Sequence, residues 1–579
     1  MPRGLHYTVD NLRLKWPLRH SIIKPNHTET AVIHLKKTIN QNAINMLRSV
    51  TDNIGDSFII TTEDGKVIVI DGGHKNETDH FLDCLKSITG KKKPHIDAWF
   101  LSHAHEDHCE VFFEIVEKRS GELSFDTVYT NFPDEAFYEG YDEWGVQNVK
   151  NFNRLLPRFA EKAQRLSEGQ ILNIGKAKFT VLYVMNPAWK ECNEASTIMR
   201  MDLGGTSVMF TGDAETKAGN YVVEKYGKTG ILKCDYCKMS HHGQSGVDRN
   251  FYEAVSPEVC FWPTPAWVYN NTNGNLRTFE TREWVKELGV KKEYKSFEGS
   301  VTIAMKPRIV LTTDAFESGY PAELAIERFA KAGFDGLDMG LDYQVDEGSP
   351  FLGDSYLDWA KMLRKKADEL GIAYTHAHAP YEADSFELAV RSIEVSAVLG
   401  ANYLVIHPIA HNENGKAIRS RRKFLKINLE AYKKLISKAE DCSVTIVAEN
   451  LLWGAASKPK VIAELVRRMN SGRFGWCFDT GHSFCTGRKF SELRDCAAAP
   501  LSLHIHDNDG NADQHMLPGK GKINWDEFIS ILGETGYIGD CVMESHSECL
   551  NSPDEERDKK LAEIVEKACE IKKKMEKVR

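Results

Sequence analysis

The sequence lacks any apolar run long enough to cross a membrane. No stretch of its 579 residues approaches the roughly 20 apolar residues that a transmembrane helix needs. The opening segment, MPRGLHYTVDNLRLKWPLRH, also lacks an apolar run followed by a small-residue cleavage site, so no signal peptide is expected. We therefore predict a cytoplasmic protein with no membrane partner.

The sequence also lacks a basic excess and a disulfide pattern. Its net charge of −9 argues weakly against a protein that binds nucleic acid over much of its surface, although it does not argue against a local basic patch. Its 13 cysteines are odd in number and irregularly spaced, as expected for buried thiols in a reducing compartment. The remaining composition, 42% hydrophobic and 27% charged, is ordinary for a globular protein.

The pattern of apolar residues changes near residue 307, which predicts more than one domain in a chain too long for a single core. Before this point, strands come in adjacent pairs, as in SFIITTEDGKVIVIDGG and STIMRMDLGGTSVMFTGD. Helical stretches interrupt them, after Asp107 and across residues 150–167. Hairpins mixed with helices predict an αββα sandwich, which we assign to residues 30–306 after an N-terminal extension of residues 1–29.

Residues 307–579 show a regular alternation of strand and helix. The apolar runs are RIVLTT, GLDMG, AYTHAH, YLVIHP, VTIVAEN, FGWCFD, LSLHIHD and CVMES, with amphipathic stretches between them. Several of these helical stretches are closed by a glycine, the usual residue after a helix C-terminus: Gly333, Gly371, Gly400 and Gly536. Eight strand–helix units predict a (β/α)8 TIM barrel of the α/β class.

Four side chains of metal-ligand type follow one strand of the first domain within six residues. They are His103, His105, Asp107 and His108. Imidazole and carboxylate groups are the ligands of a borderline divalent ion such as zinc. A surface loop has no reason to collect four such groups, so the segment predicts a metal site.

This segment resembles the HxHxDH signature of the metallo-β-lactamase superfamily. DGG at Asp71–Gly73, TGD at Thr211–Asp213 and SHHG at Ser240–Gly243 follow in the order of that family. The resemblance implies a hydrolase with one or two zinc ions that activate water, and with Asp107 also in a catalytic role. It implies His103 and His105 for one ion, and for the second Asp107, His108, Asp213 as the bridging residue, and His241 or, alternatively, His242.

The chain departs from the family pattern at one point. No histidine lies between His108 and Asp213, so the third histidine of the first metal position is missing, and Asn193 lies near its place. Together with the DNIGDSFII segment, this departure is similar to the DNA-uptake competence branch, whose relatives cleave phosphodiesters. We expect weaker metal binding at the first position.

In the barrel, acidic and imidazole side chains stand at successive strand ends, where a TIM barrel carries its active site. Charged groups that close apolar runs are costly to bury unless they are paired or bind a metal. The motifs HAPY, VIHP, AEN, FDTGH, HIHDND, MES and Asp513–Trp525 (DxHxxPGxGxIxW, with Asn524 where Asp is common) resemble the xylose-isomerase-like barrel superfamily. This superfamily contains sugar and sugar-phosphate isomerases and epimerases as well as endonuclease IV.

The resemblance leaves two chemistries open. In the isomerase branch a single Mn, Mg, Co or Zn ion is held by Glu449, Asp479, His504 and Glu544. Glu449 and Glu544 then also act as catalytic acid and base, and we assign substrate binding to His378, His407, His482, Arg419 and Arg422. In the endonuclease IV branch three zinc ions are held by His378, His407, Glu449, Asp479, His482, His504, Asp513, His515 and Glu544.

We favour the isomerase branch on three features: the PGKGKINW loop, the short connection from HAPY to EADSFELAV, and the acidic composition. Against it stands a basic run after the fourth strand: Lys416, Arg419, Arg421, Arg422 and Lys423. The leading hypothesis is a bifunctional enzyme of carbohydrate metabolism, in which a metal-dependent hydrolase of a phosphoester or related ester is fused to a metal-dependent sugar or sugar-phosphate isomerase or epimerase. The alternatives are a nucleic-acid phosphodiesterase, and a protein in which one module is a non-catalytic ligand-binding regulator. Whether the chain forms a homo-oligomer is left open.

Overall fold

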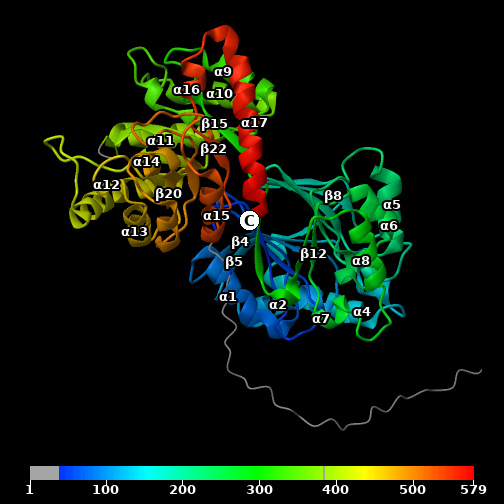
Figure 1. The fold of residues 1–579 in the computed structure, drawn as a ribbon. Coiled ribbons are helices and arrows are strands. Elements are labelled where there is room, and N and C mark those ends of the chain that lie inside the picture. The colour runs from blue at the N-terminus through cyan, green and yellow to red at the C-terminus, as the bar shows by residue number, and fades with distance from the viewer. Residues whose placement is uncertain (1–34, 36–37, 383–384, 579) are drawn as a thin grey trace, which may run out of the picture. The chain divides into compact units, whose positions relative to one another are not determined.

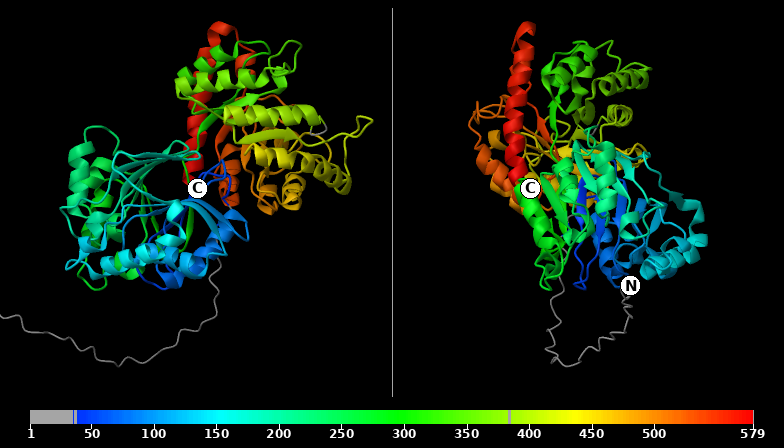
Figure 2. Two further views of the ribbon diagram at one scale, coloured as in Figure 1. Left: turned by 180° about the vertical axis from the view of Figure 1, so that it is seen from behind. Right: turned by 90° about the vertical axis from the view of Figure 1, so that its right-hand side faces the viewer.

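The computed structural model describes residues 35, 38–382 and 385–578. The predicted extension at residues 1–29 lies outside these residues. Within the described part of the chain, strands form two seven-stranded sheets and one eight-stranded sheet (Figures 1 and 2). None of the helices formed by the described residues combines the length and apolarity that crossing a bilayer requires.

The first domain is built on two mixed sheets. One sheet contains β1 (Ala43–Met46), β2 (Ser57–Thr61), β3 (Val67–Asp71), β4 (His95–Leu101), β5 (Ser124–Thr130), β6 (Ala163–Arg165) and β14 (Val301–Ala304). The other contains β7 (Ile171–Ile174), β8 (Ala177–Tyr183), β9 (Ile198–Leu203), β10 (Thr206–Phe210), β11 (Tyr236–Lys238), β12 (Val259–Trp262) and β13 (Lys292–Lys295).

Apolar side chains of the two sheets meet in a shared core, and helices cover the outer faces. Phe58 of β2 packs edge-on against Phe210 of β10, with ring centroids 5.5 Å apart. On one outer face, Trp99 of β4 stacks on Phe81 of α1 (Thr78–Thr89) and contacts α2 (Glu106–Lys118). The other outer face is covered by α5 (Thr216–Tyr226), α6 (Arg249–Val255) and α8 (Thr278–Glu287). This is the predicted αββα sandwich.

The third sheet is a parallel barrel. Its strands are β15 (Ile309–Thr312), β16 (Gly336–Gly340), β17 (Ala373–Glu382), β18 (Tyr403–His407), β19 (Thr445–Glu449), β20 (Phe474–Asp479), β21 (Ser502–His504) and β22 (Cys541–Met543). β22 pairs with β15, and a bridge between Ile505 and Met543 joins the two ends of the sheet. The outer helices include α9 (Ala322–Ala332), α10 (Tyr356–Leu370), α11 (Phe386–Leu399), α12 (Arg421–Asp441), α13 (Pro459–Met469), α15 (Trp525–Thr535) and α17 (Asp554–Val578).

Both predicted hairpins form, and the predicted TIM barrel is confirmed. The helix expected across residues 150–167 was wrong in its extent, because α4 covers Glu143–Leu155 and Ala163–Arg165 is strand β6. Pro157 follows the helix end and cannot donate a backbone hydrogen bond. Since β14 ends at Ala304 and β15 begins at Ile309, we retain the boundary near residue 306 as a proposal.

Candidate metal centres

The HxHxDH segment lies where β4 ends and α2 begins. His103 follows the strand, His105 is the extended residue before the helix, and Asp107 and His108 occupy the first helical turn. The change from extended to helical backbone directs the first two imidazoles and the last two side chains differently. The segment therefore presents its ligand-type side chains in two neighbouring groups, each a candidate metal position.

We define the second metal position by Asp107, His108, Asp213 and His242, whose ligand-type atoms lie within 4.8 Å of one another. His242 Nε2 is 3.0 Å from Asp107 Oδ2 and 3.1 Å from Asp213 Oδ2. His241 Nε2 lies 3.9 Å from Asp213 Oδ2, and its Nδ1 faces Glu215 Oε1 at 3.2 Å. The geometry thus supports His242, rather than His241, as the fourth member of this position.

The side chains at the second position fit a divalent metal ion. The buried Nε2 atoms of His108 and His242 lie 3.0–3.7 Å from carboxylate oxygens but, among the described residues, make no hydrogen bond of regular geometry. The opposite ring nitrogens are bonded, His108 Nδ1 to Asp71 Oδ2 at 2.9 Å and His242 Nδ1 to the Pro263 carbonyl at 2.8 Å. Such bonds set each ring so that its Nε2 lone pair faces the site, as in metal-binding histidines.

Charges within this group compensate for its burial. Burial raises the pKa of Asp213, but His242 and His108 outweigh it and hold that pKa well below its ordinary value. Burial lowers the pKa of His242, and Asp213 overcomes this effect and raises it to about 9. A fully buried Lys238 adds a cation, with Nζ 2.7 Å from Asp56 Oδ2 and 3.1 Å from Asp213 Oδ1. A bound cation would replace the protons that neutralise these groups in its absence.

We define the first metal position by His103 Nε2 and His105 Nδ1, which lie 3.1 Å apart. His105 Nε2 is 2.9 Å from Asp142 Oδ2, and Asp142 is also the N-cap residue of α4. The Cys192 thiol also lies near this position, because ligand-type atoms of His105, Asp142 and Cys192 lie within 4.8 Å of one another. Asn193, expected near the missing histidine, donates through Nδ2 to Glu215 Oε1 at 3.1 Å, and its Oδ1 has no partner among the described residues.

At the barrel, the strand ends bring the predicted side chains together in three groups. In the first, which we call the His407 group, His378 Nε2 lies 3.1 Å from His407 Nε2, and both nitrogens face Glu449 Oε2 at 3.5 and 3.1 Å. In the second, the His504 group, His504 Nδ1 lies 3.0 Å from Glu449 Oε1 and 3.3 Å from Glu544 Oε1. Glu449 therefore has one carboxylate oxygen in each group.

The third group, the Asp513 group, consists of His482, Asp513 and His515. Asp513 Oδ2 lies 3.0 Å from His482 Nε2 and 3.2 Å from His515 Nε2. The other nitrogens are bonded to backbone carbonyls, His482 Nδ1 to Asn450 and His515 Nδ1 to Glu544. All three side chains thus direct ligand-type atoms at one point, as the residues of a metal site do.

The pKa values of these groups show the same compensation of burial by opposite charge. Burial lowers the pKa of His378, but its hydrogen bond to Glu449 raises it to about 10. Burial lowers the pKa of His515 as well, and Asp513 raises it to about 9. Glu544 differs, because burial raises its pKa more than His504 lowers it.

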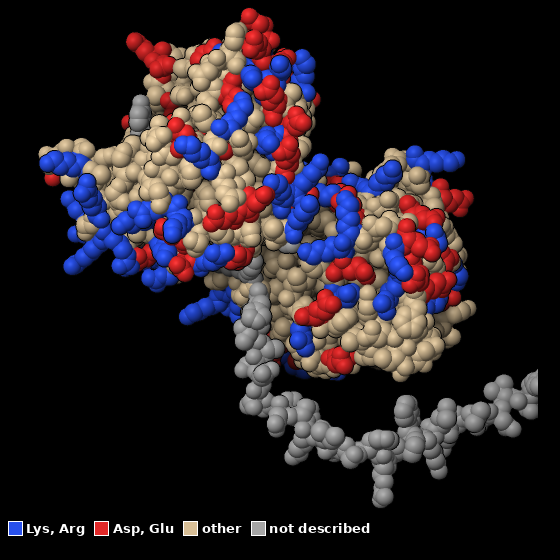
Figure 3. Space-filling view, viewed as in Figure 1, with Lys and Arg blue, Asp and Glu red and all other residues tan. Residues whose placement is uncertain are grey.

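Arg419 and Arg422, assigned to substrate binding, are exposed in and after the loop between β18 and α12. Arg421, the basic residue between Ser420 and Arg422, pairs with Glu464. Figure 3 shows lysine and arginine side chains gathered in the region of α12. These exposed residues form a basic patch where the loop after β18 leads into α12.

Sequence reasoning missed several side chains of the barrel site. His506 is buried, and its Nε2 lies 2.9 Å from Asp479 Oδ2, so the predicted ligand Asp479 faces His506 directly. Asp507 accepts hydrogen bonds from the backbone of Gly519 and Ile523 and from Trp525 Nε1, which holds the loop that carries PGKGKINW. Both lie in the motif HIHDND. The repeated imidazole and carboxylate residues at the end of an apolar strand were the sequence feature that could have identified them.

In the first domain, the missed residues are Asp71, Asp142 and Lys238. The DGG motif pointed to Asp71, and a lysine inside the apolar strand YCKMS pointed to Lys238. Asp142 had no sequence signal, because its relation to His105 exists only in three dimensions.

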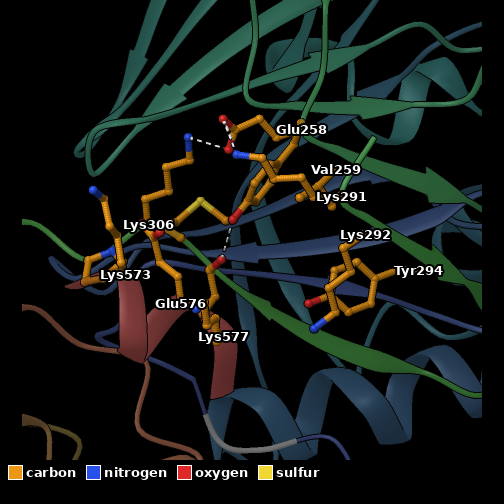
Figure 4. A pocket seen from close by; sticks show the side chains of 13 residues that line it. Glu258, Val259, Lys291, Lys292, Tyr294, Lys306, Lys573, Glu576 and Lys577 are labelled. Carbon is orange, nitrogen blue, oxygen red and sulfur yellow. Dashed lines mark hydrogen bonds and ion pairs between the residues drawn. The ribbon is translucent and has the colours of Figure 1, made fainter. Parts of the chain in front are cut away.

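A separate pocket of 710 Å³, lined by Lys291, Lys306, Lys573 and Lys577 among others, contains none of the predicted site residues (Figure 4).

Comparison with known proteins matches each part of the chain to a different family. Residues 50–118 match the model of the metallo-beta-lactamase superfamily. Residues 326–574 match the model of the xylose isomerase-like TIM barrel. These matches confirm the two resemblances found in the sequence.

Individual relatives match only parts of the chain. An uncharacterized protein of Methanocaldococcus jannaschii is 27% identical over 239 residues, covering 38% of this chain and 78% of the relative. ComE operon protein 3 of Bacillus subtilis is 25% identical over 176 residues, covering 30% of this chain and 20% of the relative. A probable endonuclease 4 of Citrifermentans bemidjiense is 24% identical over 210 residues, covering 31% of this chain and 72% of the relative.

Among solved structures, a D-tagatose 3-epimerase-like protein is 22% identical, with a TM-score of 0.37, and covers 47% of this chain and all of that protein. The two family matches do not overlap in sequence. The chain therefore contains a region that matches the metallo-beta-lactamase superfamily and is similar to a ComE operon protein, followed by a region that matches the xylose isomerase-like TIM barrel.

Proposed function

We propose that the chain is a metal-dependent phosphoesterase with two separate hydrolytic sites, one in the sandwich and one at the strand ends of the barrel. The observation that carries this proposal is the arrangement of the barrel side chains in three adjoining groups. The His407, His504 and Asp513 groups together contain eight of the nine side chains of the multi-metal alternative, and Asp479 adjoins them through His506.

Glu449 supports a multi-metal site over a single-metal one. Its Oε2 faces His378 and His407, and its Oε1 faces His504. A carboxylate with both oxygens in contact with ligand-type side chains is suited to binding two metal ions at once. It is poorly suited to transferring a proton to and from a substrate. The single-metal assignment, with Glu449, Asp479, His504 and Glu544 as ligands and His482 at the substrate, also gives no role to Asp513 and His515.

The chain's own residues would position the reaction as follows. The three groups would hold divalent ions side by side, and bound ions would supply Lewis-acid stabilisation of the phosphoryl oxygens and activation of water. Asp507 fixes the loop over Gly519–Trp525 beside the Asp513 group. The exposed Arg419 and Arg422 could pair with further phosphates of the substrate.

Similarity to a probable endonuclease 4 and to a ComE operon protein supports phosphodiesters as the substrate class of both sites. In the sandwich, the second metal position supports the same class of hydrolysis, with Asp107 and Asp213 as its carboxylates. The proposal therefore gives more weight to the phosphodiesterase alternative than the sequence did.

One observation favours the isomerase as the second candidate. Burial raises the pKa of Glu544, and its Oε2 has no hydrogen-bond partner among the described residues. A carboxyl group with a raised pKa holds its proton more strongly than an ordinary glutamate, which suits a general acid in proton transfer beside a carbonyl.

Metal content and reaction assays on the full chain distinguish the two candidates. We expect wild-type protein loaded with zinc to keep close to three equivalents that depend on barrel residues, and to cleave a phosphodiester such as abasic-site DNA. Asp513→Asn should lose one equivalent and most of that activity. A protein that binds one barrel equivalent, loses none on Asp513→Asn, and exchanges a carbon-bound proton of a sugar phosphate with deuterated solvent would be an isomerase.

A further inference from the structure

The first metal position of the sandwich has two converging histidine nitrogens but lacks the third histidine of its family. His103 Nδ1 contacts Ser102 Oγ at 3.1 Å and His105 Nε2 contacts Asp142 Oδ2 at 2.9 Å. These contacts leave His103 Nε2 and His105 Nδ1, 3.1 Å apart, directed at one point. Two histidines alone bind a metal weakly, so a further donor is needed beside the Cys192 thiol, which lies near His105 and Asp142.

The SHHG motif presents two imidazoles rather than one. His241 and His242 both adopt left-handed backbone conformations, with φ of 45° and 54°. Non-glycine residues rarely adopt this conformation, and two in succession are a strain that persists at functional sites. Gly243 completes the turn, since a Cβ there would lie 2.1 Å from the Trp262 ring.

His242 is committed to the second metal position. Its Nδ1 donates to the Pro263 carbonyl, and its Nε2 lies between Asp107 and Asp213. His241 is held in a different orientation, with Nδ1 2.6 Å from Ser245 Oγ and 3.2 Å from Glu215 Oε1. Its Nε2 has a longer contact, 3.5 Å from Asn193 Nδ2, and is therefore the ring nitrogen more available to a metal.

His241 Nε2 lies 3.9 Å from Asp213 Oδ2, and His241 lines the same 460 Å³ pocket as His105 and Asp107. Lys238 occupies Asp213 Oδ1, so that Oδ2 alone faces His108, His242 and His241. A single oxygen with histidines on either side is suited to bridging two ions.

We infer that the SHHG motif supplies one histidine to each metal position, with His241 Nε2 taking the place of the missing third histidine beside His103 and His105. The two positions then share Asp213 Oδ2 as a bridge. This inference rests on the proposed function of the sandwich as a metal-dependent hydrolase. It departs from the sequence prediction, which placed His241 at the second position and left the first incomplete.

Zinc content of full-length variants tests the inference without relying on activity. Each variant is loaded with zinc, freed of excess by gel filtration and analysed by mass spectrometry of the metal. His241→Gly is the preferred variant, because glycine adopts the left-handed backbone freely and offers no ligand. We expect His241→Gly and His103→Ala each to lose one zinc, and the double variant to lose the same single zinc.

Two comparisons make the result decisive. His241→Gly combined with His242→Gly should lose two zinc ions, and His74→Ala, a histidine that lines the same pocket, should lose none. Thermal denaturation checks that each variant is folded. If a variant of His241 fails to fold, cobalt(II) spectra of His241→Asn, which also tolerates a left-handed backbone, should show the loss of one nitrogen ligand.

The outcomes separate this inference from the proposed function. It is overturned if His241→Gly keeps the wild-type zinc content, or if the His103→Ala/His241→Gly pair loses two ions while each single variant loses one. If Asp213→Ala and His242→Gly also keep all their zinc, the metal-dependent hydrolase proposed for the sandwich fails as well.

Discussion

His242 Nε2 lies 3.0 Å from Asp107 Oδ2, which joins the helix that follows β4 to the turn that follows β11. The contact brings together two sequence motifs, HxHxDH and SHHG, that belong to different sheets. Several predictions about metal binding depend on this pairing and on the contacts around it.

Replacing His242 by Gly should remove the ion at the second metal position. We expect phosphodiesterase activity of the sandwich to fall by about 100-fold or more, because loss of even an outer partner of a metal ligand costs about 10–100-fold. Measurement of activity and zinc content on the same preparation checks this. His95→Ala is a control, since that histidine is partly exposed on β4 and contacts Ser124; equal losses in both variants would contradict the assignment.

Asp142→Asn should weaken metal binding at the first position without unfolding α4. The amide oxygen can still cap the helix by accepting from Gly145, but it no longer offers a charged partner for His105 Nε2. We expect the zinc dissociation constant to rise about 10- to 100-fold in chelator competition, with little change in melting temperature. Asp134→Asn, at the N-cap of α3 (Glu135–Tyr138), should leave zinc affinity unchanged.

In the barrel, Glu449→Gln should cost more metal than Asp513→Asn. Glu449 has one oxygen in the His407 group and the other in the His504 group, whereas the carboxylate contacts of Asp513 lie mainly in one group. We therefore expect Glu449→Gln to lose two zinc equivalents and Asp513→Asn to lose one. Asp509→Asn, at an exposed loop carboxylate, serves as the control, and a loss of one equivalent in both test variants would refute the shared role of Glu449.

Acid should destabilise the barrel through Asp540. Burial raises the pKa of this carboxyl, but Arg308 lowers it further, so the folded-state pKa lies below the ordinary value. A carboxyl whose pKa is depressed by folding stabilises the protein above its unfolded pKa, and this contribution is lost as pH falls through the folded value. We expect the wild-type melting temperature to fall below about pH 4.

The variant Asp540→Asn isolates this contribution. At neutral pH its free energy of unfolding should be lower by about 3 kcal/mol, because the buried Arg308 loses one of its two carboxylate partners. The remaining partner, Glu63, keeps the loss at the lower end of the range for a broken buried ion pair. Its melting temperature should also depend less steeply on pH below about pH 4 than that of the wild type. Asp358→Asn, at an exposed carboxylate of α10, should behave as the wild type does; identical acid profiles for all three proteins would exclude Asp540 as the source.

Local sequence patterns predicted the architecture because they reflect local physics. The alternation of apolar runs with amphipathic stretches predicted the barrel, and Gly333, Gly371, Gly400 and Gly536 do adopt left-handed conformations after helices. The helix across residues 150–167 was misplaced, because a short strand at Ala163–Arg165 is stabilised by pairing with β5, which is not a local interaction.

The grouping of ligand-type side chains at the candidate metal sites was predictable in composition but not in detail. The motifs named the ligand types, because a strand end that carries several buried imidazoles and carboxylates has few other uses. The choice between His241 and His242 depends on two successive backbone conformations that the sequence does not specify. The contact of Asp142 with His105 depends on how α4 packs beside α2, and this again requires the tertiary structure.

If the barrel binds ions as proposed, the position of Glu449 between two groups would make its metal loading cooperative. An ion in the His407 group would set the carboxylate that the His504 group also needs, so each ion would prepare the site for the next. By linkage, the affinity gained by the second ion equals that gained by the first. When metal is scarce, the population would then consist of fully metal-loaded and nearly metal-free molecules. Scarcity would lower the fraction of active molecules and leave the activity of each loaded molecule unchanged.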